Sequence, residues 1–190
     1  MTEVTSGWRS RGYIPHFDAR GAVQHVIFGL DDSIPRTESA SDINAFDTAL
    51  DLGLGACLLA CADCAMIVQS ELLRSDGDQY RLLAWCVMPN HVHVVLEQDS
   101  DLAGIVRRWK SWTAREVNRA TGQSGRLWRR EYYDRFARTH EHLQTMVNYV
   151  EANPAAAGLV NSIEAWRWSS VRFKLGADKD AGQAPGGPNS

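Results

Sequence analysis

The sequence predicts an α+β fold, an antiparallel sheet with helices packed on one face, of the ferredoxin-like (RRM-like) kind. Short β-rich segments and longer helical patterns carry this prediction, because they follow one another in the order β-α-β-β-α. The 190 residues are enough for one domain with a sizeable core, and the hydrophobic content of 44% is ordinary for a globular protein. We expect an N-terminal arm over residues 1–12 and a single domain over residues 13–173.

The first half of the domain combines one strand with two helices. The segment AVQHVIFGL (22–30) alternates and is rich in β-branched residues, which predicts a strand. Residues 41–52 and 57–74 have helical patterns, and the glycines between them interrupt the run. A turn is expected at SDGD (75–78).

The middle of the chain predicts a hairpin. Residues 79–88 and 91–97 have the composition of strands, and Pro89 and Asn90 between them favour a tight connection. A helix over residues 101–121 follows.

The last third is more irregular. Residues 125–138 are basic and aromatic, with room for a short strand, and residues 140–153 form a helix. This helix is expected to end near Asn153, because the residue before a proline is disfavoured in the α region. Residues 174–190 lack apolar periodicity and are expected to be a disordered tail.

Charge is distributed unevenly, although the net charge is only −3. Residues 31–99 contain twelve acidic and three basic residues, whereas residues 107–138 contain ten basic and three acidic ones, a local charge of +7. Aromatic residues alternate with these arginines, a combination that suits contact with phosphates and stacking of bases. The sequence therefore predicts a basic face for a polyanion, with scattered arginines on a solvated helix as the alternative.

Four cysteines, Cys57, Cys61, Cys64 and Cys86, do not make a disulfide framework in a chain of this size. The first three have the C-x3-C-x2-C spacing of iron–sulfur ligands in radical enzymes, but such enzymes need a larger barrel than this chain offers. One face of the predicted helix would hold all three, so buried free thiols are the favoured interpretation.

Neither a membrane span nor a secretory leader is indicated. No apolar run approaches the length of a membrane span, and the N-terminal residues MTEVTSGWRSRGY lack the apolar core of a signal peptide. A cytoplasmic protein without a membrane partner is expected.

Two histidines stand one residue apart in MPNHVHVVLE (88–97). Alternate side chains of a strand share a face, so His91 and His93 point together while the intervening valine points the other way. Two neutral imidazoles can hold a divalent metal between them, and a third ligand must then come from elsewhere. Histidines on an exposed face, or satisfied within a polar core, are the alternative. Glu97 shares this face and could orient a ligand, although a surface carboxylate is the simpler interpretation.

The segment NYVEANPAAAGLV (148–160) supplies a second group of polar residues. Tyr149 and Asn153 are four residues apart and lie on the same helical face. A phenol with a pKa of about 10 is a poor nucleophile at neutral pH, but a metal that polarises a phosphate makes its attack plausible. Asn153 offers a hard carbonyl oxygen, suited to Mg²⁺ or Mn²⁺. By itself, such a tyrosine is usually a core or rim residue.

Together, these stretches resemble the single-tyrosine HUH transposases (IS200-like) and, more closely, the REP-associated tyrosine transposases of bacteria. The HUH motif is His91, Val92 and His93 in this chain, and the tyrosine segment follows it. The segments SRGYIPHFDARGAVQHVIFGL and LWRREYYDRFAR are also similar to that family, so the resemblance spans residues 7–173. The cysteine-rich ACLLACADCAM and the tail after residue 173 depart from it.

The resemblance implies a HUH nuclease fold with the histidines on a central strand and a Mg²⁺ or Mn²⁺ ion. It implies that His91, His93 and Asn153 hold this metal and that Tyr149 is the nucleophile. Members of the family act on single-stranded DNA with hairpins, form a 5′-phosphotyrosine link and release a 3′-hydroxyl. The expected protein is thus a metal-dependent endonuclease and transposase that cleaves and rejoins hairpin (REP-like) DNA, as a monomer or homodimer associated with the nucleoid.

The basic segment is expected to hold the DNA. The expected contacts are Arg107, Arg108, Lys110, Arg115, Arg126, Arg129, Arg130, Tyr132, Tyr133 and Arg135. Tyr132 and Tyr133 could be nucleophiles instead of Tyr149. They lack a partner at helical spacing, however, and a loop positions a nucleophile less well than a helix does.

Two other functions remain compatible with the sequence. In a metal-dependent phosphodiesterase, water would attack and Tyr149 would be dispensable. A binding module without chemistry would grip DNA hairpins, and its affinity would hardly depend on His91.

Overall fold

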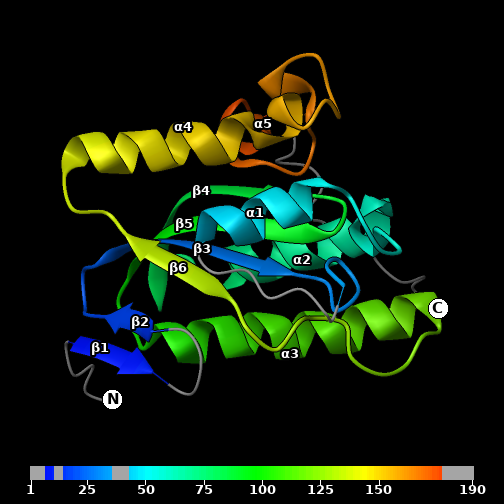
Figure 1. Cartoon of the computed structure of the whole chain (residues 1–190), viewed down its shortest axis with the longest axis horizontal. Helices are drawn as coiled ribbons and strands as arrows, with labels where there is room; N and C mark the ends of the chain where they lie inside the picture. Colours follow the sequence, from blue (N-terminus) through cyan, green and yellow to red (C-terminus); the bar gives the residue numbers. More distant parts are fainter. Residues whose placement is uncertain (1–6, 11–14, 36–42, 177–190) are drawn as a thin grey trace, which may run out of the picture.

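The computed structural model describes residues 7–10, 15–35 and 43–176. Figure 1 shows a central sheet with helices above and below it. Its elements are β1 (Gly7–Ser10), β2 (Pro15–Asp18), β3 (Val23–Gly29), α1 (Ile43–Asp51), η1 (Leu58–Ala60), α2 (Ala62–Arg74), β4 (Tyr80–Val87), β5 (His91–Gln98), α3 (Leu102–Thr121), β6 (Tyr133–Phe136), α4 (His140–Ala156), η2 (Ile163–Ala165) and α5 (Ser170–Lys174).

The main sheet has the strand order β4-β5-β3-β6, and every neighbouring pair is antiparallel. Along the chain, β3, α2, β4, β5, α3 and β6 follow the β-α-β-β-α-β order of a ferredoxin-like domain. The predicted α+β class and antiparallel sheet are therefore confirmed. β1 and β2 form a separate two-stranded sheet, so part of the expected N-terminal arm is a hairpin strand.

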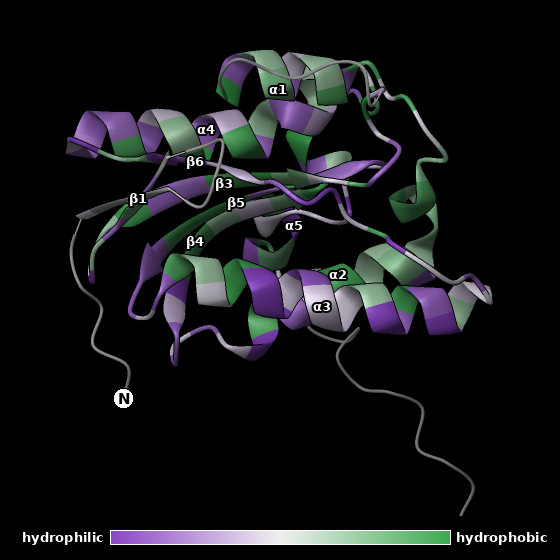
Figure 2. Cartoon of the chain, turned by 60° about the horizontal axis from the view of Figure 1, so that its bottom comes forward, coloured by the Kyte–Doolittle hydropathy of each residue, from purple (hydrophilic) through white to green (hydrophobic). Residues whose placement is uncertain are grey.

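Helices cover both faces of the sheet, not one face as the sequence predicted. Figure 2 shows α2 and α3 on one side and α1 and α4 on the other. The first pair packs on alternate residues of β3 and β5, such as Phe28 and Val94, and builds the larger core. Two smaller clusters, around Leu50 of α1 and Val150 of α4, lie on the opposite face. The prediction was wrong because α1 and α4 also have apolar stripes, which must be buried.

The cysteine segment is less helical than predicted. Cys57 has a left-handed φ of 47°, a single 3-10 turn follows, and α2 begins only at Ala62. Cys64 is buried, whereas Cys61 is exposed, so the expectation of three buried thiols on one helical face is wrong. Among the described residues, none of these cysteines belongs to a cluster of side chains close enough together to bind one metal ion.

The C-terminal helices extend further than expected. α4 continues through Pro154 to Ala156 because the proline lies in its last turn, where the missing N–H removes a single backbone hydrogen bond. Asn153 is therefore helical and buried. α5 includes Lys174, whose Nζ lies 2.7 Å from Glu151 Oε1, so ordered structure reaches into the predicted tail. Residues 177–190 lie outside the described residues, as do 1–6, 11–14 and 36–42.

Candidate active site

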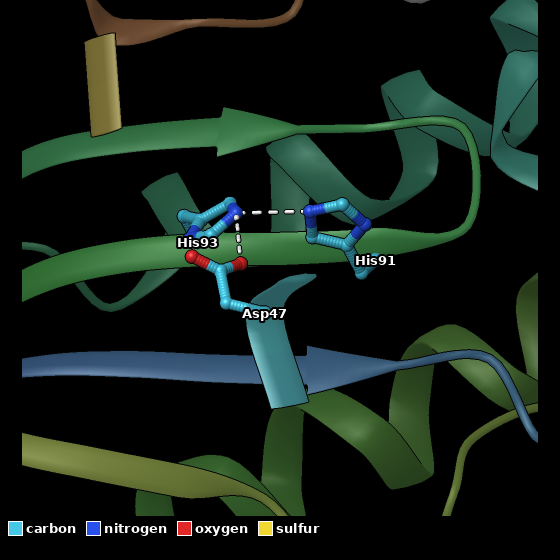
Figure 3. Close-up of side chains that lie close together, drawn as sticks. All are labelled: Asp47, His91 and His93. Atoms are coloured by element: carbon cyan, nitrogen blue, oxygen red, sulfur yellow. Dashed lines mark hydrogen bonds and ion pairs between the residues drawn. The ribbon is translucent and has the colours of Figure 1, made fainter. Parts of the chain in front are cut away.

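β5 places the two histidines side by side on the face covered by α1 and α4. His91 and His93 are 1% and 0% exposed, and their Nε2 atoms lie 2.9 Å apart (Figure 3). The hairpin of β4 and β5 fixes this position, because β5 pairs with β4 on one side and β3 on the other. The prediction that His91 and His93 lie on the same face of the strand is therefore confirmed.

Neighbouring side chains set the protonation of both rings. His91 Nδ1 lies 2.7 Å from Asn90 Oδ1, and since an amide oxygen only accepts, Nδ1 donates and Nε2 keeps its lone pair in the neutral ring. His93 Nδ1 lies 3.2 Å from Nε2 of His25, on β3. Burial lowers the pKa of all three histidines, that of His93 to about 3, so the rings are neutral metal-ligand forms. His25 and Asn90 are orienting residues that the sequence analysis missed.

α1 brings two carboxylates to these rings. Asp47 Oδ1 lies 3.3 Å from His93 Nε2, and Asp51 Oδ1 lies 3.7 Å from His91 Nε2. Burial raises the pKa of Asp47, and burial together with the nearby Asp47 raises that of Asp51 to about 6. The two aspartates are one helical turn apart, a spacing that was visible in the sequence, but nothing local to it indicated that α1 would face the histidines.

Asp47, His91 and His93 form a group whose ligand atoms all lie within 4.8 Å of one another. Asp47 Oδ1 is buried and has no hydrogen-bond partner, which is costly for a carboxylate oxygen. A divalent cation would satisfy this oxygen and the two converging nitrogen lone pairs. These donors suit a metal that accepts both imidazole and carboxylate ligands.

The approach of α1 depends on a glycine. Gly29 pairs with His91 across β3 and β5. A Cβ atom added at Gly29 would lie 2.7 Å from Leu50 Cδ2 and 2.7 Å from Ser33 Oγ. The absent side chain therefore lets Leu50, three residues after Asp47, pack directly against the strand.

Tyr149 projects from α4 onto the same group. Its hydroxyl donates a hydrogen bond to Asp47 Oδ2, and its ring centroid lies 6.0 Å from that of His93 and 6.0 Å from that of His25. The side chain is 44% exposed, so a substrate can reach it. Burial and the Asp47 carboxylate raise the pKa of this phenol.

Asn153 lies one helical turn after Tyr149 on α4 and is 3% exposed. Its Oδ1 is buried without a hydrogen-bond partner, like Asp47 Oδ1. The structure thus brings Asn153 next to the nucleophile candidate, and its role as a metal ligand stays a prediction. Glu97 forms an ion pair with Arg81, as a surface carboxylate does.

Part of the predicted DNA-binding set lines one basic groove. A groove of about 560 Å³ runs between α3 and residues 125–132. The residues of the predicted set that line it include Arg107, Lys110, Arg126, Arg130 and Tyr132. Arg129 also lines it but donates a 2.7 Å hydrogen bond to the Ile34 carbonyl. Arg115 is exposed on α3, while Arg108 lies 3.6 Å from Glu71 of α2.

Three residues of the predicted set also have contacts within the fold. Tyr132 stacks on His16 and Tyr133 on Phe46, each with ring centroids 4.3 Å apart, and both tyrosines are only 9% exposed. Both rings therefore contribute to packing, but Tyr132 also lines the basic groove, so contact of the two tyrosines with DNA stays a prediction. Lys110 Nζ donates to the carbonyls of Arg129 at 3.1 Å and Glu131 at 2.9 Å, and burial lowers its pKa to about 7. It ties residues 129–131 to α3.

Among the described residues, no helix is long and apolar enough to cross a membrane. Residues 71–153 match the family model "Transposase IS200 like". This stretch contains His91, His93, Tyr149 and Asn153. None of the curated proteins searched matches the chain.

Among the solved structures that match this chain are two transposases. A REP-associated tyrosine transposase bound to a REP hairpin shares 17% identity with a TM-score of 0.57, and the match covers 100% of this chain and 99% of that one. A candidate transposase from Deinococcus radiodurans R1 shares 18% identity with a TM-score of 0.39, over 72% of this chain and 91% of that one. The first match shows a shared fold. The family match over residues 71–153 agrees with the resemblance inferred from the motifs.

Proposed function

We propose that this transposase is a metal-dependent single-stranded DNA endonuclease that cleaves and rejoins hairpin DNA, such as REP-like palindromes, through a 5′-phosphotyrosine intermediate. One observation carries the proposal: the hydroxyl of Tyr149 donates a hydrogen bond to Asp47, which forms a buried group of possible metal ligands with His91 and His93. A partly exposed phenol above a metal-sized set of ligands is the arrangement that attack on a phosphodiester requires.

His91, His93 and Asp47 would hold Mg²⁺ or Mn²⁺, with the unpaired Oδ1 of Asn153 as a further oxygen ligand. When bound, the ion polarises the scissile phosphate and stabilises charge on the departing oxygen. Asn90 and His25 keep the two ring nitrogens turned toward the site.

The reaction exchanges one phosphoester bond for another. Tyr149 Oη attacks phosphorus in line, and the bond between phosphorus and the 3′-oxygen breaks. The phenolic proton passes to Asp47 Oδ2, which already accepts a hydrogen bond from this hydroxyl. The products are a 5′-phosphotyrosine and a free 3′-hydroxyl. Attack of another 3′-hydroxyl on the phosphotyrosine reverses the exchange, so joining needs no ATP.

All four side chains come from one chain, which makes a monomer sufficient for the site, and a homodimer would carry two such sites. The similar structure was solved with a REP hairpin, and the basic groove between α3 and residues 125–132 supports DNA as the partner of this chain as well. We expect it in the cytoplasm, associated with the nucleoid.

The test is to incubate purified protein with Mn²⁺ and a labelled single-stranded hairpin from its own genome, and to run a denaturing protein gel. The proposal expects label at the mass of the protein, lost in Tyr149→Phe. Cleavage that survives this substitution without a labelled protein band would instead establish a hydrolase in which water attacks. Hairpin binding without any cleavage would establish a binding module.

A further inference from the structure

A second basic surface lies beside Tyr149, on the opposite side of β6 from the α3 groove. A cavity of about 320 Å³ opens between the start of α4, α1 and the sheet. Tyr149 and Asp47 form part of its wall, and Arg135 of β6 and His142 of α4 form another part. The nucleophile candidate therefore shares a cavity with two side chains that can donate hydrogen bonds to an anion.

A neighbouring cavity of about 450 Å³ shares Arg135 and His142 with the first. It continues to Arg138 and to two aromatic rings, Phe17 and Phe136, which stack on each other with centroids 4.6 Å apart. Both volumes fall in the range of about 300–1,000 Å³ that is usual for small-ligand pockets. Two adjoining pockets with a cationic wall between them match the repeat of a nucleic-acid strand, in which base and sugar alternate with phosphate.

The donors at the shared wall are available to a phosphate. Arg135 is exposed, and its Nη2 donates to Asn44 Oδ1 at 3.1 Å. No other hydrogen bond of its guanidinium group is found among the described residues. His142 Nδ1 accepts from the backbone N–H of Arg138 at 3.4 Å, so in the neutral ring its Nε2 carries the hydrogen and can donate. The carboxylates that line the two cavities are Asp47, which belongs to the metal group, and Asp134, which pairs with His16.

We propose that the two cavities bind two successive nucleotides of single-stranded DNA next to the cleavage site, and that Arg135 and His142 hold the phosphate between them. This rests on the proposed function, which puts the scissile phosphate at Tyr149. The basic groove of α3 is then free to hold the hairpin, while this second surface positions the strand that is cut. Arg135 is a substrate-positioning residue in this scheme.

The first test measures binding in the Tyr149→Phe background, so that no cleavage occurs. A fluorescent oligothymidylate is titrated with protein at several salt concentrations, with Arg135→Ala compared with Arg81→Ala. Arg81 is the matched control, because it is an exposed arginine on β4, the opposite edge strand, and its substitution removes the same charge. Arg135→Ala should weaken binding about tenfold at low salt, as expected for the loss of a charge-assisted hydrogen bond. It should also reduce the slope of log affinity against log salt by about 0.7, the value for one phosphate on a single strand.

Arg135→Lys should restore most of the salt slope, since it keeps the charge, and His142→Ala should weaken binding in the same assay. Equal affinities and equal slopes for Arg135→Ala and Arg81→Ala would overturn the inference. Thermal melting of each variant confirms that it is folded.

The second test separates this inference from the proposed function. With Tyr149 present and hairpin DNA as substrate, Arg135→Ala should raise KM and leave kcat nearly unchanged. A labelled protein band that forms in Arg135→Ala with the wild-type KM would refute the strand position and leave the tyrosine mechanism standing. The mechanism itself fails if cleavage persists in Tyr149→Phe, or if the wild type binds the hairpin without cleaving it.

Discussion

At the scale of single residues, Asp47 has two different neighbours on its two oxygens. Oδ1 faces His93 Nε2, and Oδ2 accepts from Tyr149. One carboxylate therefore joins the candidate metal group to the candidate nucleophile. Asp51, one turn later, contacts only the histidine side and is more exposed. The two aspartates form a natural pair of test and control, with the same chemistry on the same helix.

We predict that Asp47→Asn weakens Mn²⁺ binding by more than about 100-fold, because it removes a charged ligand. Asp51→Asn should weaken it by about 10- to 100-fold, the effect usual for a residue outside the ligand set. Titration of free Mn²⁺ by electron paramagnetic resonance measures both affinities. Equal losses in the two variants would show that Asp47 has no special place in the site.

At the scale of elements, the sequence predicted most strands and helices because their periodicities are local. Alternation put His91 and His93 on one face, and helical spacing put Asn153 one turn from Tyr149. Local pattern could not place α1, because the contact between Asp47 and His93 joins two elements that are distant in the chain. The aromatics of the basic segment are ambiguous for a related reason: a ring that packs on Phe46, as that of Tyr133 does, has the same sequence signature as one that stacks on a base.

The junction of α2, β4 and α3 yields a prediction of pH dependence. Tyr80 Oη donates to the Leu72 carbonyl at 2.6 Å and accepts from Trp109 Nε1 at 2.9 Å. Burial raises the pKa of this phenol to about 12, above the ordinary value of about 10. The folded state therefore holds the proton more tightly than the unfolded state does. The stability that this contributes is complete below about pH 10 and is lost as the pH rises toward 12.

Chemical unfolding between pH 8 and 12 should show this loss in the wild type and a flatter profile in Tyr80→Phe, which has no proton to lose. Tyr133→Phe serves as the control phenol, because Tyr133 belongs to the separate cluster around Leu50. Identical alkaline profiles for wild type and Tyr80→Phe would contradict the prediction.

At the scale of the whole molecule, the two faces of the sheet have separate tasks. The larger core lies with α2 and α3, whereas the polar site is enclosed between the other face and α1 and α4. Buried polar groups without partners weaken that second layer, as Asp47 Oδ1 and Asn153 Oδ1 show. A cation that satisfies them should therefore stabilise the entire fold.

We expect Mn²⁺ at 100 times its Kd to stabilise the native state by about 2.7 kcal/mol, since it binds the folded chain and not the unfolded one. Differential scanning calorimetry should then show a higher Tm with Mn²⁺ in the wild type and none of this increase in His93→Ala. An equal increase in both proteins would mean that the ion binds elsewhere.

The bare backbone at Gly29 bears on how such a domain can change during evolution. A methyl group there would lie 2.7 Å from Leu50 Cδ2, so the Leu50 side chain must move. Because Leu50 is fully buried, we expect this movement to disturb the packing of α1, and with it the position of Asp47. The larger core on the opposite face, and the arginine-lined groove beside α3, would be left in place. One small mutation could thus separate gripping DNA from cutting it. Under the proposed function, a substitution at Gly29 could abolish DNA cleavage and preserve DNA binding, although Gly29 is neither a proposed metal ligand nor a proposed DNA contact.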